Sequence, residues 1–126
     1  IIDDEKIITQ TLQRLIRKEL HYSVVIANNG KEALRRIEML RNQRSKTFDL
    51  IICDIRMPEL DGIETIKRVK RIIVESNGNP TPVIFMTGYE GVKAEQEAKA
   101  LGYVDYLYKP FDTDDFLFSV QKHLRS

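Results

Sequence analysis

A short apolar run that ends in a single carboxylate is the feature that most constrains the fold of this chain. Residues 50–53, Leu-Ile-Ile-Cys, lead directly into Asp54, and Pro58 follows in a loop. A run of this length, rich in branched residues and bounded by turn residues, is typical of a buried parallel strand. We therefore predict that Asp54 lies at the carboxyl end of a central strand, where open α/β sheets place their ligand sites. A capping aspartate at a strand-to-helix turn is the alternative for this residue alone.

The remainder of the chain alternates between strand-like and helix-like patterns. Strands are expected over residues 1–2, 22–27, 48–54, 83–87 and 103–108, and helices over residues 5–20, 33–40, 63–73, 92–101 and 113–124. Between them, residues 41–47 are expected to form a polar connector and residues 76–82 a loop. Asn28 or Asn29 can cap the second helix and Thr113 the last, while Gly102 closes the helix before it. Five successive βα units predict a parallel sheet with helices on both faces.

Charge and length exclude several classes of function. The 20 basic and 19 acidic residues give a net charge of +1, so there is no electrostatic case for direct binding to nucleic acid or membrane. No apolar run approaches the roughly 20 residues that span a bilayer. Cys53 is the single cysteine of the sequence, which rules out an internal disulfide and favours a reducing, cytoplasmic compartment. Its place inside the apolar run predicts a small buried core residue.

The first strand is shorter than expected. The sequence begins without Met, and Ile1-Ile2 stands where a strand of about five or six residues is usual. We therefore expect residues 1–126 to be one domain taken from a longer chain, with a truncated first strand.

Reactive side chains follow several of the predicted strands at the point where each strand ends. They are Asp3 and Asp4, Asp54, Thr87, and Lys109. In a doubly wound sheet these ends meet at one edge, where three carboxylates repel one another and one lysine offsets part of that repulsion. Clustered carboxylate oxygens favour Mg²⁺. A carboxylate nucleophile, a divalent metal and an ammonium together form a phosphoryl-transfer site, although each residue taken singly has an ordinary structural explanation.

Four separate motifs of the chain, taken in their order along the sequence, resemble those of a known family. The motifs are Asp3-Asp4, Asp54 in Asp-Ile-Arg-Met-Pro-Glu-Leu-Asp-Gly, Met86-Thr87-Gly88, and Tyr106 with Lys109-Pro110-Phe111. Over essentially its whole length the chain resembles the receiver domains of two-component response regulators, the CheY-like fold. The resemblance implies a flavodoxin-like (βα)5 doubly wound parallel sheet of strand order 2-1-3-4-5.

The resemblance also implies a reaction and its metal. Asp54 would accept a phosphoryl group from a sensor histidine kinase or a histidine phosphotransfer protein, and the domain would catalyse its own phosphorylation and dephosphorylation. Asp3, Asp4, Asp54 and the backbone carbonyl of Arg56 would bind Mg²⁺. Thr87 and Lys109 would bind the phosphoryl oxygens.

Further implied features concern the response to phosphorylation. The Lys109–Pro110 peptide bond is expected to be cis, which aims the ammonium inward. Thr87 and Tyr106 are expected to form a switch, in which the Tyr106 ring turns from exposed to buried. This would alter a face within residues 92–124 that serves a downstream effector or a dimer partner.

Two residues are expected to lengthen the life of the phosphoryl group. Arg56 and Tyr89 lie two positions beyond Asp54 and Thr87, and their side chains can shield the approach of an attacking water.

Three other functions compete with this interpretation. A haloacid-dehalogenase-type phosphotransferase resembles Asp-x-Asp at its nucleophile, and Arg56 stands where the second aspartate would be. An FMN-binding flavodoxin needs a hydroxyl- and glycine-rich phosphate loop after the first strand, where Asp3-Asp4 would repel phosphate. A pseudo-receiver that acts only as a docking module is disfavoured by the intact acidic set.

Overall fold

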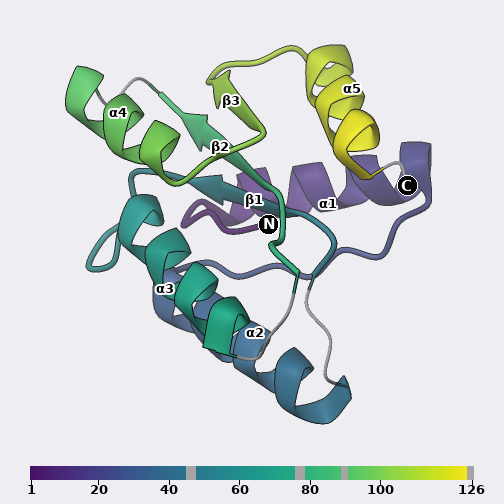
Figure 1. Cartoon of the computed structure of the whole chain (residues 1–126). Helices are drawn as coiled ribbons and strands as arrows, with labels where there is room; N and C mark the ends of the chain where they lie inside the picture. The colour runs from purple at the N-terminus through teal and green to yellow at the C-terminus, as the bar shows by residue number, and fades with distance from the viewer. Residues whose placement is uncertain (45–47, 76–78, 89–90, 125–126) are drawn as a thin grey trace.

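The computed structural model describes residues 1–44, 48–75, 79–88 and 91–124 (Figure 1). Helices and strands alternate from α2 onward, and α1 and α2 follow each other with no regular strand between them. The helices are α1 (Lys6–Leu20), α2 (Gly30–Arg44), α3 (Gly62–Glu75), α4 (Val92–Ala100) and α5 (Thr113–Leu124), and the strands are β1 (Ile51–Asp54), β2 (Val83–Thr87) and β3 (Asp105–Tyr108).

The sheet is parallel and has the predicted order. β1 pairs with β2 and β2 with β3, so that Cys53 lies opposite Phe85 and Phe85 opposite Tyr106. On the other side of β1, Ile2 forms parallel bridges with both Cys53 and Ala27. The order across the sheet is therefore the segment ending at Ala27, the segment at Ile2, then β1, β2 and β3, which confirms the 2-1-3-4-5 arrangement.

The first two predicted strands are shorter than regular strands. Within residues 22–27 a single bridge at Ala27 remains, although backbone bonds continue to either side of it. The Ala27 N–H donates to the Ile1 carbonyl over 2.9 Å, and the Asp3 N–H donates to the Ala27 carbonyl over 3.1 Å. Because a strand needs a partner along its length, residues 22–26 have little ladder to join.

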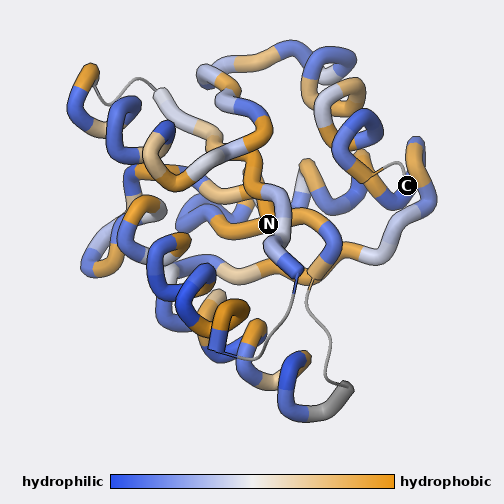
Figure 2. Tube along the Cα trace, in the orientation of Figure 1, coloured by the Kyte–Doolittle hydropathy of each residue, from blue (hydrophilic) through white to orange (hydrophobic). Residues whose placement is uncertain are grey.

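The core is divided by the sheet into two clusters. α1 and α5 cover one face of the sheet, and α2, α3 and α4 cover the other (Figure 1). Ile84 and Met86 of β2 point toward α1 and α5, and Phe85 points the opposite way. Apolar residues accordingly run through the central strands, with polar residues on the outer turns of the helices (Figure 2). A strand buried on both faces has no polar position to alternate with, which explains the uninterrupted apolar runs.

Cys53 is a core residue, as predicted. It is fully buried against both neighbouring strands, and burial raises the pKa of its thiol. Among the described residues, every helix is too short or too polar to serve as a membrane span.

One predicted helix end and one predicted helix cap are wrong. α2 continues to Arg44, into the first part of the segment 41–47 that we expected to be a connector, and Arg41 pairs with Glu38 one turn back at 2.8 Å. α5 begins at Thr113 itself, and the residue before it provides the cap, since the Asp114 N–H donates to the Asp112 carboxylate over 2.8 Å. Asn29 does cap α2, through the Glu32 N–H at 2.7 Å.

Gly62 lets α3 begin directly beside the end of β1. Its N–H donates to the Ile55 carbonyl over 2.7 Å. A Cβ at this position would overlap the Asp54 carbonyl oxygen, so any larger residue must push the loop away from the strand end. The close approach of Gly62 therefore fixes the backbone that carries Asp54.

We expect Gly62→Ala to lower the free energy of unfolding by about 2 kcal/mol, because the backbone must shift to relieve the overlap. Gly88→Ala is the matched control, since a Cβ at Gly88 meets nothing within 4 Å. Urea denaturation of both variants measures the difference. Equal stability of the two would contradict the close approach described above.

Candidate functional site

Three carboxylates meet at the carboxyl edge of the sheet. One oxygen from each of Asp3, Asp4 and Asp54 lies within 4.8 Å of the others. Asp3 and Asp54 are buried, and Asp4 is exposed. The sheet sets this arrangement directly, because the Asp54 N–H donates to the Ile2 carbonyl over 2.8 Å and so aligns the two strand ends.

Lys109 reaches into the cluster from the end of β3. Its Nζ donates to Asp3 Oδ2 over 2.8 Å and lies 3.5 Å from Asp54 Oδ1. Its backbone N–H donates to the Thr87 carbonyl over 2.6 Å, and the Lys109–Pro110 peptide bond is cis, as the resemblance implied. The residues predicted from three separate strand ends therefore meet around one ammonium.

The sequence did not reveal the groups that hold Asp3. Its Oδ1 accepts the Glu5 N–H over 3.0 Å, and its carbonyl accepts from Asn28 Nδ2 over 3.0 Å. The same Asn28 amide lies 3.2 Å from the Thr9 hydroxyl. Asn28 directly follows the second predicted strand, so the strand-end rule could have identified it, but we had interpreted it as a candidate helix cap.

Burial and crowding perturb the two groups at the centre of the site. The pKa of Asp54 is raised from 3.8 to about 7, mainly by burial and then by the charge of Asp3, and Lys109 offsets part of this. Burial alone would lower the pKa of Lys109, but its hydrogen bond to Asp3 and the charges of Asp54 and Glu5 outweigh burial and raise it. Before any metal binds, the ammonium is thus held firmly charged while Asp54 resists ionisation.

The carboxylates fit a magnesium ion. Mg²⁺ binds oxygen at about 2.1 Å, so two ligands of one ion lie at most about 4.2 Å apart, and the three carboxylate oxygens, all within 4.8 Å of one another, need only small movements to meet this limit. The exposed Asp4 leaves the cluster open to water, which Mg²⁺ retains in most protein sites. Lys109 already supplies a cation to Asp3 and Asp54, which shows that this position favours positive charge.

The expected switch residues are in contact. Thr87 is buried at the end of β2, and a side-chain hydrogen bond joins it to Tyr106. We expected the Tyr106 ring to start exposed; instead it is half-buried, with its centroid 5.2 Å from the ring of Tyr103 and 5.3 Å from that of Tyr108. Burial, followed by the neighbouring charges, raises the pKa of its hydroxyl. Thr87 is thus linked to an aromatic row along the edge strand.

Arg56 and Tyr89 are the two residues expected to shield the phosphoryl group. Arg56 follows β1 by two residues and its side chain is exposed. Tyr89 lies outside the described residues.

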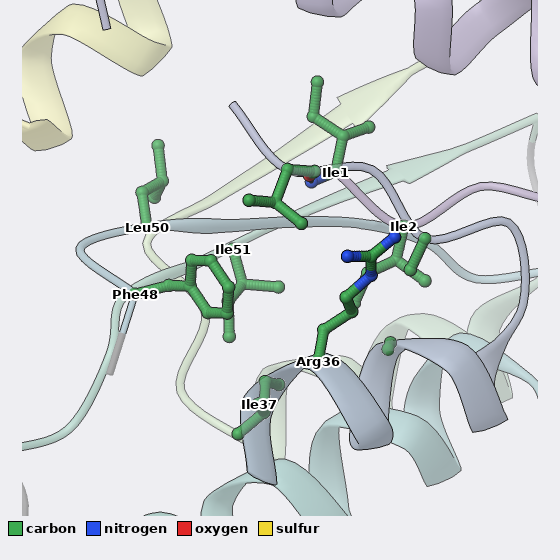
Figure 3. A pocket seen from close by; sticks show the side chains of 10 residues that line it. Ile1, Ile2, Arg36, Ile37, Phe48, Leu50 and Ile51 are labelled. Atoms are coloured by element: carbon green, nitrogen blue, oxygen red, sulfur yellow. The ribbon is translucent and has the colours of Figure 1, made fainter. Parts of the chain in front are cut away.

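Two hollows within the described residues lie away from this cluster. A cavity of about 40 Å³ between the sheet and α2 is lined mainly by apolar side chains, with Arg36 extending toward Ile1 and Ile2 (Figure 3). A larger one of about 400 Å³ includes Leu50, Val120 and Leu124. Both adjoin the start of β1, at the opposite end of the strand from Asp54. The carboxylate cluster is therefore separate from both of these hollows.

A family model and several known proteins match nearly the whole chain. The model of the response regulator receiver domain matches residues 1–121. The chain is 38% identical over 125 residues to the transcriptional regulatory protein ZraR of Escherichia coli K12, covering 98% of this chain and 25% of that protein. It is 36% identical over 124 residues to sporulation initiation phosphotransferase F of Bacillus subtilis, covering 98% and 90%. The chain thus spans about a quarter of the length of its ZraR relatives and most of the second protein.

Solved structures agree. The chemotaxis protein CheY4 of Vibrio cholerae superposes with a TM-score of 0.78 at 32% identity, covering 98% of this chain and 94% of that one. The receiver domain of the histidine kinase CKI1 of Arabidopsis thaliana, solved in complex with Mg²⁺ and BeF₃⁻, gives a TM-score of 0.83 at 27% identity, covering 97% and 85%.

The raised pKa of Asp54 predicts a pH-dependent stability in metal-free protein. Because its folded-state pKa of about 7 exceeds the unfolded value of 3.8, the protonated form favours folding. The stabilisation of the folded state by protonated Asp54 is complete below pH 3.8 and is lost as the pH rises through 7. In EDTA, Asp54→Asn should therefore stabilise the protein at pH 8, by on the order of 2 kcal/mol.

The stabilisation by Asp54→Asn should shrink as the pH falls toward 4, where wild-type Asp54 is already neutral. Asp49→Asn, at an exposed aspartate, is the control and should show no such trend. Denaturation curves between pH 4 and 8 measure the effect. An increase in the free energy of unfolding by Asp54→Asn that did not vary with pH would contradict the electrostatic account.

Proposed function

The chain belongs to the response regulator receiver domains, the phosphoacceptor modules of two-component signalling, and on that premise we propose that Asp54 is its phosphoryl acceptor. The observation that carries this proposal is the position of Asp54, buried at a strand end with the Lys109 ammonium at 3.5 Å and Asp3 beside it. Family membership removes the dehalogenase and flavodoxin alternatives. The pseudo-receiver alternative is decided by the labelling experiment below.

The proposed reaction is a direct transfer of a phosphoryl group from a nitrogen or oxygen atom of the donor to a carboxylate oxygen of Asp54. A carboxylate oxygen of Asp54 forms a bond to phosphorus while the bond from phosphorus to the donor's leaving atom breaks, and the electron pair departs with the donor. Lys109 then turns from Asp3 toward the transferred oxygens, and the Thr87 hydroxyl donates to another of them.

Receiver domains typically use Mg²⁺, and we propose that this chain binds it through Asp3, Asp4, Asp54 and the backbone carbonyl of Arg56. When bound, the ion neutralises charge on the transferring oxygens. The carboxylate spacing and the open side at Asp4 support this assignment.

Partners follow from the family in general terms, since receiver domains interact with histidine kinases or phosphotransfer proteins and with effector domains. For this chain we propose a phosphohistidine donor, either a sensor kinase or a phosphotransfer protein. We also propose a cytoplasmic location, in keeping with the free thiol of Cys53.

We propose that the output surface is formed by α4, β3 and α5. Large apolar side chains are exposed on each of these elements: Val92 at 65%, Tyr108 at 47% and Phe118 at 69%. An effector or dimer partner that covered them would gain hydrophobic stabilisation. The hydrogen bond between Thr87 and Tyr106 lies between this face and Asp54, so a pull on Thr87 reaches β3 directly.

Incubation with acetyl phosphate and Mg²⁺ should add one phosphoryl group to the wild type. Asp54→Asn should gain none, because its amide is not a nucleophile, whereas the control Asp49→Asn should be labelled like the wild type. Intact-protein mass spectrometry measures all three. Undiminished labelling of Asp54→Asn would remove the proposed acceptor.

Millimolar Mg²⁺ should raise the melting temperature of the wild type by a few degrees, since an ion that binds the folded state alone stabilises it by linkage. Asp54→Asn should lose most of this shift, and Asp49→Asn should keep it. Differential scanning fluorimetry with and without EDTA measures the effect. An unchanged melting temperature in the wild type would argue against the metal site.

Beryllofluoride with Mg²⁺ should move the amide resonances of Tyr106 and of α4, because acceptor atoms on Asp54 draw the Thr87 hydroxyl away from Tyr106. Thr87→Ala should still bind beryllofluoride near Asp54 but lose the shifts at Tyr106. Thr11→Ala, at an exposed position on α1, should behave like the wild type. Changes in the Tyr106 amide resonance that persisted in Thr87→Ala would show that the Thr87 hydroxyl does not couple Asp54 to Tyr106.

A further inference from the structure

A further carboxylate lies beside Lys109 and is open to solvent. Glu5 Oε1 lies 4.0 Å from Lys109 Nζ, and the Glu5 side chain is 64% exposed. The Glu5 N–H holds Asp3 Oδ1 at 3.0 Å, which fixes the start of the Glu5 side chain relative to the cluster. Unlike Asp3 and Asp54, which also contact this ammonium, Glu5 is not part of the carboxylate group that fits a metal ion.

We propose that Glu5 is a specificity-determining residue, whose charge selects against small phosphodonors that carry two negative charges. The inference rests on the proposed function of Asp54 and deepens it by naming the class of donor that the site disfavours. Donors with a compensating positive charge beside the phosphoryl group, such as a protonated phosphoramidate, meet a weaker penalty.

The physical basis is the charge that surrounds Lys109. Its single positive charge is shared among Asp3 at 2.8 Å, Asp54 at 3.5 Å and Glu5 at 4.0 Å. An incoming phosphoryl group competes with all three for the ammonium, and the Glu5 carboxylate, 4.0 Å from that ammonium, also repels its negative charge. Repulsion between charges scales with their product, so a dianion is slowed by the square of the factor that slows a monoanion.

Both donors can transfer a phosphoryl group to Asp54 without another reactant. With acetyl phosphate, the bond between phosphorus and the acetyl oxygen breaks as the bond to the Asp54 oxygen forms, and acetate leaves with the electron pair. With phosphoramidate, which carries an ammonium on phosphorus and a net charge of −1, the phosphorus–nitrogen bond breaks and neutral ammonia leaves. The transferred group is the same, and only the charge of the donor differs.

Glu5→Gln tests the proposal because it removes the charge and keeps the shape. Within the described residues the Glu5 side chain makes no capping bond to α1, so the variant should fold like the wild type. Glu19→Gln, at an exposed carboxylate near the other end of α1, is the matched control.

Apparent second-order rate constants for labelling by acetyl phosphate and by phosphoramidate are measured with saturating Mg²⁺ at low and high ionic strength. At low ionic strength, Glu5→Gln should speed labelling by acetyl phosphate roughly two- to five-fold, and labelling by phosphoramidate by about the square root of that factor. Added salt should shrink both gains, and Glu19→Gln should match the wild type with both donors.

A Glu5→Gln variant that left the ratio of the two rate constants unchanged would overturn the inference while leaving Asp54 as the acceptor. A gain that ignored ionic strength, or that appeared equally in Glu19→Gln, would also overturn it. Failure of both donors to label the wild type would instead overturn the proposed function, and this inference with it.

Discussion

The structure depends on one ammonium placed among buried carboxylates. Asp3 and Asp54 lie side by side with little access to solvent, an arrangement that would be strongly unfavourable if both were charged and unpaired. Lys109 makes it possible by contacting both. The same arrangement is what a phosphoryl acceptor needs, because a site that stabilises cations among oxygen ligands can also hold a metal and neutralise an incoming phosphoryl group.

The fold brings these groups together from positions far apart in the sequence. Asp3 and Lys109 are separated by 106 residues, yet their side chains are joined by a 2.8 Å hydrogen bond. Parallel strands make this possible, because each ends at the same edge of the sheet. Gly62 allows the loop after β1 to turn back against the Asp54 carbonyl, so Asp54 is carried on backbone that has little room to move.

Much of this could be predicted from sequence, because a buried strand that stops at a polar residue is visible in the order of residues alone. That rule found Asp3, Asp54, Thr87 and Lys109. It could not find Glu5, whose link to Lys109 depends on the path of the chain as it enters α1. The end of α2 and the cap of α5 were predicted wrongly for a related reason: a local ion pair or a capping side chain one residue away from the expected position decides where a helix begins or ends.

Chemical trapping of the modified residue tests the central claim most directly. Borohydride reduces an aspartyl phosphate to homoserine, so protein treated with acetyl phosphate and Mg²⁺, then with borohydride, can be digested and sequenced by mass spectrometry. The account predicts homoserine at position 54 and aspartate retained at positions 3 and 4. Homoserine at another aspartate, with position 54 unmodified, would contradict it.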